Sequence, residues 1–228
     1  MDYNNKIIAS NAELNILVNS HLKVCFNYPI INMTNFFSEE YDDNIINVIS
    51  IDFSHFNSSL LENTANIFFG CNALESLNFL NFETFHVSNM ANMFYNCSSL
   101  KSINLSGFNT INVENMNSMF SGCISLESLN LFNFNTIKVK DMANTFAGCS
   151  SLKSINLSSF NTINVEKMNS MFSGCISLES LNLISFNVIN VKDMANMFSG
   201  CSSLKSINLS NFFTDNLENM QCLLNAFL

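Results

Sequence analysis

The sequence predicts an α/β fold in which short units stack into a solenoid, with a parallel β-sheet on one face and short helical turns on the other. The first observation is a repeat, because six cysteines are spaced 26 residues apart, at Cys71, Cys97, Cys123, Cys149, Cys175 and Cys201. The second is that each unit carries two hydrophobic periodicities, one typical of a strand and one typical of a helix. A unit this short cannot bury its own apolar face, so the copies have to stack on one another.

Other residue types keep the same frame. Asn lies seven places after each of these cysteines, Phe eleven places after it and Met nineteen places after it. A further copy without the cysteine begins near Ile45, so we expect seven 26-residue repeats over residues 45–228. Many of the 23 Phe and 12 Met of this 228-residue chain are therefore core positions copied from unit to unit.

The strand is expected near the start of each unit and the helical turns near its end. Ile103 and Leu105 alternate with polar residues, which is the pattern of a half-buried strand. Val113, Met116 and Met119 then follow at spacings of three, which indicate one or two helical turns. Strands of neighbouring units would lie about 4.8 Å apart, so seven rungs would span roughly 35 Å.

Both ends of the array need cover, because an open rung exposes apolar core and an unpaired strand edge. We expect residues 1–44 to form an N-terminal cap that is partly helical, since they carry the apolar pattern Ile7, Ile8, Leu14, Leu17, Val18 and Leu22. At the other end, residues 222–228 are an apolar tail. Either this tail folds over the final rung, or the chain is a fragment, or the ends of two molecules pair.

Composition and charge exclude several classes of function. The chain has a formal net charge of −9, with nine Lys and no Arg, so it offers little to neutralise nucleic-acid phosphates or to bind anionic lipids. No apolar run approaches the roughly 20 residues that span a bilayer. The first 30 residues also lack the pattern of a signal peptide. We therefore expect no nucleic-acid partner and no membrane insertion.

Charged residues alternate in sign from unit to unit. Four places after the cysteines the series is Glu75, Lys101, Glu127, Lys153, Glu179 and Lys205. Seventeen places after them it is Glu114, Lys140, Glu166, Lys192 and Glu218. In a stack, each charge would have opposite charges one rung away. We expect a modest stabilising effect from both series, unless the order of signs merely reflects duplication of a 52-residue unit.

No group of residues predicts catalysis, a metal site or a cofactor. Zinc ligands lie a few residues apart, whereas these cysteines are uniformly spaced and the three histidines do not follow them. A cysteine at the end of an M-F-x-x-C turn is usually a small buried hydrophobic residue. We expect buried free thiols, with Cys25 and Cys222 as the more reactive ones, and a solvated loop at the acidic residues 39–43.

The exposed face of the sheet is the candidate binding surface. If Ile103 and Leu105 point inward, Ser102 and Asn104 point outward, and every unit repeats this Ser and Asn. Leu80, Phe132 and Ile184 follow the strand in alternate units; they are candidate anchors for a partner unless they tuck under the neighbouring turn. The Ser and Asn ladders could also be no more than solvated, mutually hydrogen-bonded side chains. The candidate partner-binding residues are Ser102, Asn104, Ser128, Asn130, Phe132, Ser154, Asn156, Ser180, Asn182 and Ile184.

These motifs resemble a known family. The strand portion L-x-x-I-x-L-x-x-F-N resembles a leucine-rich repeat. The full unit, with NMxxMFxxCxSLxSLNLSxFNT, is similar to the BspA-type leucine-rich repeats of the DUF285 family. The resemblance covers roughly residues 45–228 and implies a leucine-rich-repeat solenoid. Members are typically surface proteins of bacteria and protists that bind host proteins or other cells.

Together the residues and the resemblance predict a non-enzymatic surface or adhesion-type protein, which binds a protein or cell-surface ligand through the exposed sheet face. The cell-surface location follows from the resemblance alone. The alternative is a structural or assembly protein whose solenoid ends stack into oligomers. Substitutions on the sheet face would abolish the first activity, whereas capping the C-terminal rung would abolish the second.

Overall fold

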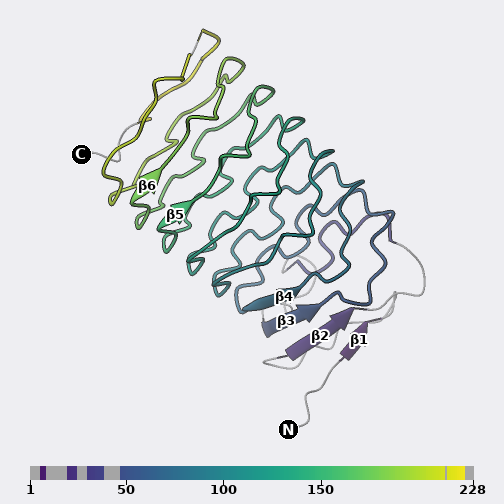
Figure 1. Ribbon diagram of the computed structural model, residues 1–228. Helices are drawn as coiled ribbons and strands as arrows, with labels where there is room; N and C mark the ends of the chain where they lie inside the picture. The colour runs from purple at the N-terminus through teal and green to yellow at the C-terminus, as the bar shows by residue number, and fades with distance from the viewer. Residues whose placement is uncertain (1–5, 9–19, 25–29, 39–46, 214, 224–228) are drawn as a thin grey trace.

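In the computed structural model the chain winds into a solenoid whose coils stack in one row (Figure 1). The structure describes residues 6–8, 20–24, 30–38, 47–213 and 215–223. A parallel sheet has the strand order β1-β2-β3-β4, formed by Lys6–Ile8, Ser20–Val24, Val48–Asp52 and Ser76–Asn78. Further along, β5 (Ser154–Ile155) pairs in parallel with β6 (Ser180–Leu181). The predicted solenoid with a parallel sheet along one face is confirmed.

Neighbouring coils pair in register with the 26-residue repeat. Ile51 lies opposite Leu77, and Ile155 lies opposite Leu181. A second row of parallel bridges joins Asn89 to the equivalent residue of each following coil as far as Asn219. The second row therefore connects successive coils throughout this range, whereas strand pairing joins only some of the coils, those of β1–β4 and of β5–β6 among them.

The predicted helical turns are not found in the described part of the chain, where successive β-turns take their place. Within residues 90–97, three N–H groups donate to the carbonyl three residues earlier, at 3.1 to 3.3 Å. Asn92 and Asn96 have φ values of 54° and 56°, and such left-handed residues interrupt a right-handed helix. The N–H groups between the turn bonds donate to the next coil, as Asn92 does to the carbonyl of Asn117 at 2.8 Å. We call residues 90–97 and their equivalents the turn side.

The left-handed positions explain part of the Asn and Gly content. Gly tolerates positive φ without steric cost, and Asn tolerates it better than most residues do. The first such position of the turn side is occupied by Asn66, Asn92, Ser118, Asn144, Ser170 and Asn196. The second is occupied by Gly70, Asn96, Gly122, Gly148, Gly174 and Gly200. The biased composition is thus in part a requirement of the backbone.

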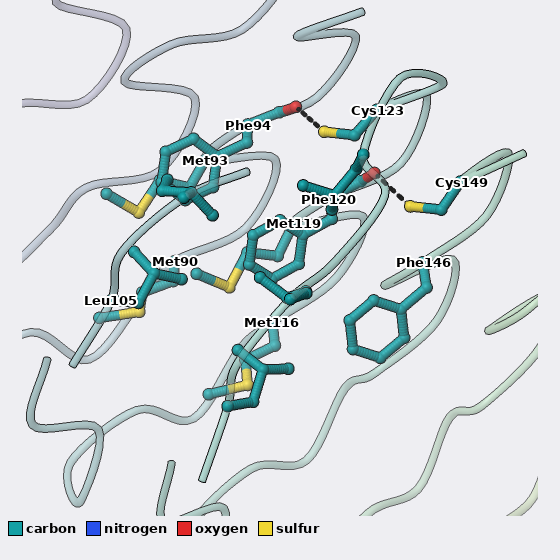
Figure 2. Packing of buried hydrophobic residues seen from close by; sticks show 14 of the residues in the cluster. Met90, Met93, Phe94, Leu105, Met116, Met119, Phe120, Cys123, Phe146 and Cys149 are labelled. Carbon is teal, nitrogen blue, oxygen red and sulfur yellow. Dashed lines mark hydrogen bonds between the residues drawn. The ribbon is translucent and has the colours of Figure 1, made fainter. Parts of the chain in front are cut away.

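Columns of identical side chains fill the core. The phenylalanines of the turn side stack with ring centroids 5.4 to 5.9 Å apart and planes within 16° of parallel, and Figure 2 shows three of them, Phe94, Phe120 and Phe146. Met116 and Met119 are buried beside this column. Because each ring touches the ring above and the ring below, the column links every coil to its neighbours.

The repeat cysteines are buried at the end of the turn side. The Sγ–H of Cys123 donates to the carbonyl of Phe94 at 3.1 Å, and that of Cys149 to the carbonyl of Phe120 at 3.2 Å (Figure 2). The same bond recurs in each coil from Cys71 to Cys201. The predicted buried free thiols are confirmed for these six residues, and Cys25 lies outside the described residues.

Part of residues 1–44 continues the solenoid, as far as the structure describes them, at residues 6–8, 20–24 and 30–38. Where the structure describes them, β1 and β2 extend the parallel sheet, and residues 30–38 follow the path of the turn side. Met33 and Phe37 are buried like their equivalents in later coils. These described residues are not helical, whereas residues 9–19, which hold Leu14, Leu17 and Val18, lie outside the described residues. The partly helical character expected of residues 1–44 therefore stays a prediction. Whether residues 1–44 act as a separate cap stays a prediction.

The last described coil is less covered than those before it. Met220 is 58% exposed, whereas the equivalent Met194 is 0% exposed. Leu209 and Phe212 are only half-buried. Residues 224–228 lie outside the described residues, so the predicted fate of the apolar tail stays a prediction.

Candidate binding surface

The predicted partner-binding residues lie on the outer side of the strand segments. Ile103 and Leu105 are 9% and 2% exposed, and the alternation along the strand turns Ser102 and Asn104 outward. We call the outer side of residues 75–81 and of the equivalent segments the sheet face. The remaining segments are 101–107, 127–133, 153–159, 179–185 and 205–211. All ten predicted residues are exposed on it, namely Ser102, Asn104, Ser128, Asn130, Phe132, Ser154, Asn156, Ser180, Asn182 and Ile184.

The asparagines of the sheet face each use one end of the side-chain amide. The Oδ1 of Asn104 accepts the N–H of Ser106 at 3.0 Å, and that of Asn130 accepts the N–H of Phe132 at 3.1 Å. This bond fixes the turn that follows the strand. Among the described residues, the Nδ2 group of neither asparagine has a protein partner. The face therefore presents rows of amide and hydroxyl donors at a spacing of about 4.8 Å.

The apolar residues of the sheet face stand in solvent. Leu80, Phe132 and Ile184 are 62%, 66% and 63% exposed, so the alternative that they tuck under a neighbouring turn is wrong. A hollow of about 320 Å³ lies beside Leu80 and includes Ser106 and Gly107 in its lining. A second hollow, of about 470 Å³, lies beside Ile184.

A second apolar row was missed by the sequence analysis. It lies fourteen residues after the repeat cysteines and consists of Phe85, Ile111, Ile137, Ile163 and Ile189. Phe85 is 49% exposed and Ile189 40% exposed, and Ile189 lines the same hollow as Ile184. The constant offset of fourteen residues from the repeat cysteines could have identified this row in the sequence.

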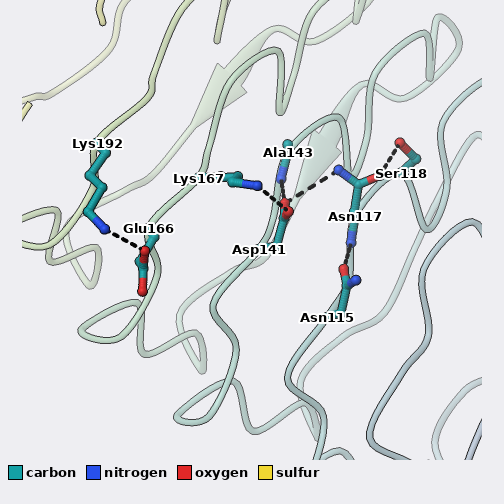
Figure 3. A network of polar contacts seen from close by, with 8 residues as sticks. All are labelled: Asn115, Asn117, Ser118, Asp141, Ala143, Glu166, Lys167 and Lys192. Atoms are coloured by element: carbon teal, nitrogen blue, oxygen red, sulfur yellow. Dashed lines mark hydrogen bonds and ion pairs between the residues drawn. The ribbon is translucent and has the colours of Figure 1, made fainter. Parts of the chain in front are cut away.

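The series of charges seventeen places after the cysteines forms ion pairs within the chain. Lys140 Nζ lies 2.7 Å from Glu114 Oε2, and Lys192 Nζ lies 2.7 Å from Glu166 Oε2 (Figure 3 shows the second pair). The hydrogen bond from Lys140 lowers the pKa of Glu114. We call this series the edge ladder, and its expected pairing is confirmed for these two pairs. The neighbouring position adds a further contact, from Lys167 to Asp141 at 3.6 Å.

The series on the sheet face is mostly unpaired. Within the described chain, only Lys205 and Glu179 approach each other, at 3.4 Å. The other members of this series, from Glu75 to Lys153, form no ion pair with any described residue, and the modest stabilising effect expected of the series stays a prediction. Holding two long, solvated side chains in one geometry costs entropy that a surface pair barely recovers.

The chemistry of the described residues gives no support to a metal or nucleophilic site. They include no cluster of three or more His, Cys, Asp or Glu that could hold a metal ion. Burial raises the pKa of the Cys123 thiol to about 12, which leaves it protonated at neutral pH. The acidic residues 39–43 lie outside the described ranges. In the described part of the chain, no helix has the length and hydrophobicity to cross a bilayer.

Comparisons with known proteins agree with the geometry. The model of the family described as "Mycoplasma protein of unknown function, DUF285" matches residues 31–153 and 123–227. A leucine-rich repeat protein of T. pallidum (TpLRR) has 19% identity and a TM-score of 0.54, covering 88% of this chain and 83% of its own. One from Eubacterium ventriosum has 14% identity and a TM-score of 0.44, covering 91% and 68%. No curated protein matches this chain.

Proposed function

Because this chain belongs to the DUF285 family and folds as a leucine-rich-repeat solenoid, we propose that it is a non-enzymatic binding protein that acts at a cell surface. Its sheet face would hold another protein or a host-cell ligand. The rigid stack would supply many weak contacts at once, and no chemical step is involved.

The observation that carries this proposal is the mixed character of the sheet face. Leu80, Phe132 and Ile184 are each more than 60% exposed on a surface whose other exposed residues are mostly Ser, Asn and charged residues. Large exposed apolar side chains surrounded by polar ones are typical of binding anchors. Leu80 and Ile184 lie four coils apart, or roughly 19 Å at strand spacing, which suits an extended protein segment rather than a small molecule.

A second candidate function is assembly through the ends of the solenoid. Met220 occupies a core position and is 58% exposed in the last described coil. A partner coil stacked on this end would cover it. Such a protein would form chains whose length grows with concentration.

Binding by immobilised protein tests the first candidate. We expect a protein from the surface of a host cell to be retained by the wild type, and retention to fall at least tenfold, about 1.4 kcal/mol, in Phe132→Ser/Ile184→Ser. The matched control is Ile124→Ser/Ile176→Ser, since these residues are 49% and 50% exposed but lie outside the sheet face. Equal retention by both double variants would contradict the proposal.

A further inference from the structure

The sheet face alternates between two kinds of coil. Three coils carry a large apolar residue together with a glutamate, and we call them apolar coils; their pairs are Leu80 with Glu75, Phe132 with Glu127, and Ile184 with Glu179. The other three carry a serine together with a lysine, and we call them serine coils; their pairs are Ser106 with Lys101, Ser158 with Lys153, and Ser210 with Lys205. Along the stack, the size of the residue after the strand and the sign of the charge before it therefore alternate together.

The serine coils leave room on the surface. The hollow of about 320 Å³ includes Ser106 and Gly107, and a Cβ atom added at Gly107 would meet nothing within 4 Å. The hollow of about 470 Å³ lies between Ile184 and Phe213 and includes Asn211, the neighbour of Ser210. Two of the three projecting apolar side chains, Leu80 and Ile184, thus lie beside a hollow that extends into the next coil.

We propose that the sheet face binds a second copy of this chain, in an antiparallel arrangement about a two-fold axis that lies parallel to the strands. The axis passes between segments 127–133 and 153–159, the third and fourth of the six. Such an axis reverses the order of the coils and keeps the position along each strand. Because six is even, every apolar coil then faces a serine coil of the partner copy. This dimer rests on the proposed function, because it uses the same sheet face. It specifies a second copy of the chain as the protein that binds there.

The arrangement matches both shape and charge. Phe132 lies over Ser158 of the other copy, and the two-fold axis repeats this contact with the roles exchanged. Ile184 faces the hollow at Ser106, and Leu80 faces the surface at Ser210. In the same register each glutamate meets a lysine, in the pairs Glu127 with Lys153, Glu179 with Lys101, and Glu75 with Lys205.

A comparison of the edge ladder with the charge series of the sheet face supports an intermolecular role for the sheet-face series. The edge ladder pairs within the chain at 2.7 Å, whereas Lys101, Glu127 and Lys153 form no ion pair with any described residue. An axis along the solenoid instead would place each coil on its own equivalent, so that apolar coils faced apolar coils. Only the antiparallel arrangement gives each lysine of the sheet face a glutamate at the same strand position.

The size of the face predicts a weak complex. Six coils at about 4.8 Å and seven residues at about 3.3 Å give a footprint of roughly 670 Å² on each copy. The total of about 1,300 Å² is near the lower limit of specific interfaces. Dimers should therefore dissociate in the micromolar range, and self-association should compete with any other ligand of the sheet face.

Sedimentation equilibrium on the purified chain, from about 1 to 200 µM, is the first test. We expect the mass to rise from 25.6 kDa toward twice that value and to stop there. Phe132→Ser/Ile184→Ser should weaken association at least tenfold, and Ile124→Ser/Ile176→Ser should leave it unchanged. A wild type that stays monomeric at the highest concentration would overturn the proposal, and so would masses that grow past the dimer.

Charge exchange tests the register. One variant carries Glu75→Lys, Glu127→Lys and Glu179→Lys, and its counterpart carries Lys101→Glu, Lys153→Glu and Lys205→Glu. Each should be monomeric alone, and an equimolar mixture should restore a dimer. If either variant fails to fold by circular dichroism, the apolar variants decide the question. Two folded variants that dimerise alone as well as they do together would refute the charge pairing.

Crosslinking tests the antiparallel direction of the dimer. It also separates self-association from the proposed binding of other proteins. In Ser106→Cys/Ile184→Cys the two thiols of one chain are three coils apart, roughly 14 Å at strand spacing, too far for an internal disulfide. Mild oxidation should give a covalent dimer, and each single variant should not. If no dimer forms while immobilised protein still retains other proteins, self-association fails and the proposed function stands.

Discussion

The turn side and the sheet face contribute unequally to the solenoid. On the turn side, four N–H groups between Met116 and Gly122 donate to the next coil at 2.7 to 3.0 Å. The cysteine and phenylalanine columns add contacts there in every coil. On the sheet face of the C-terminal half, strand pairing consists of the two-residue strands β5 and β6 and of single bridges, Asn130 to Asn156 and Leu181 to Ile207. We conclude that the turn side holds the coils together, which leaves the sheet face able to carry exposed binding residues.

The largest expected effect separates two phenylalanines. Phe120 is 1% exposed within the stacked column, so Phe120→Ala should lower the free energy of unfolding by about 3–5 kcal/mol. Phe132 is 66% exposed, so Phe132→Ala should change it by less than about 0.5 kcal/mol. Urea unfolding monitored by circular dichroism measures both. Similar losses in the two variants would contradict the comparison.

The buried thiols of the turn side predict a loss of stability at high pH. Burial raises the pKa of Cys123 from 9.0 to about 12, so the folded chain holds a proton that the unfolded chain releases between these values. The contribution is intact below about pH 9 and falls by about 1.4 kcal/mol per pH unit for each such thiol above it. Urea unfolding at a series of pH values checks this. Cys123→Ser, which keeps a donor for Phe94, should make the decline less steep, and an identical decline would argue against the thiol.

Glycines on the two sides should respond differently to alanine. Gly148 has φ of 72°, so Gly148→Ala should cost about 1–2 kcal/mol of unfolding free energy. Gly107 on the sheet face has open space around it, and Gly107→Ala should be neutral. Gly122→Ala should be worse than Gly148→Ala, since the new Cβ would also clash with Asn96 Oδ1. Thermal melting of the three variants ranks them, and a harmful Gly107→Ala would show that the sheet face is more constrained than we infer.

The smallest effect concerns the two charge series. Lys140→Gln removes a 2.7 Å ion pair with Glu114, and Lys153→Gln removes none. We expect a small drop in Tm for the first variant at low salt, which vanishes near 1 M salt, where the screening length is about 3 Å. The monomeric Lys153→Gln protein should melt like the wild type. A larger, salt-dependent drop in Tm for Lys153→Gln would show that the sheet-face series, and not the edge ladder, stabilises the monomer.

The sequence predicted the parts of the molecule that the repeat itself determines. The 26-residue period, the inward Ile103 and Leu105, and the buried cysteines all follow from apolar positions copied from coil to coil. The turn side was misread, because apolar residues three and four apart suit overlapping β-turns as well as a helix. Asn92 and Asn96, four residues apart, were the sign of left-handed positions.

Exposure at the candidate site was harder to predict. Whether Phe132 tucks under a turn or stands in solvent depends on where the chain bends after the strand, and a hydrogen bond to Asn130 determines that bend. The unpaired state of Lys153 likewise depends on side-chain geometry, which an alternation of signs does not contain. The partly exposed apolar row from Phe85 to Ile189 could have been predicted from its constant offset of fourteen residues from the repeat cysteines.

Hydrogen exchange on the monomeric chain tests the central claim most directly. Peptides that cover the turn side, such as residues 116–123, should exchange their amide protons the slowest, because those protons bond within the coil and to the next coil. Peptides that cover residues 101–107 of the sheet face should exchange much faster. Slow exchange on the sheet face together with fast exchange on the turn side would contradict the account.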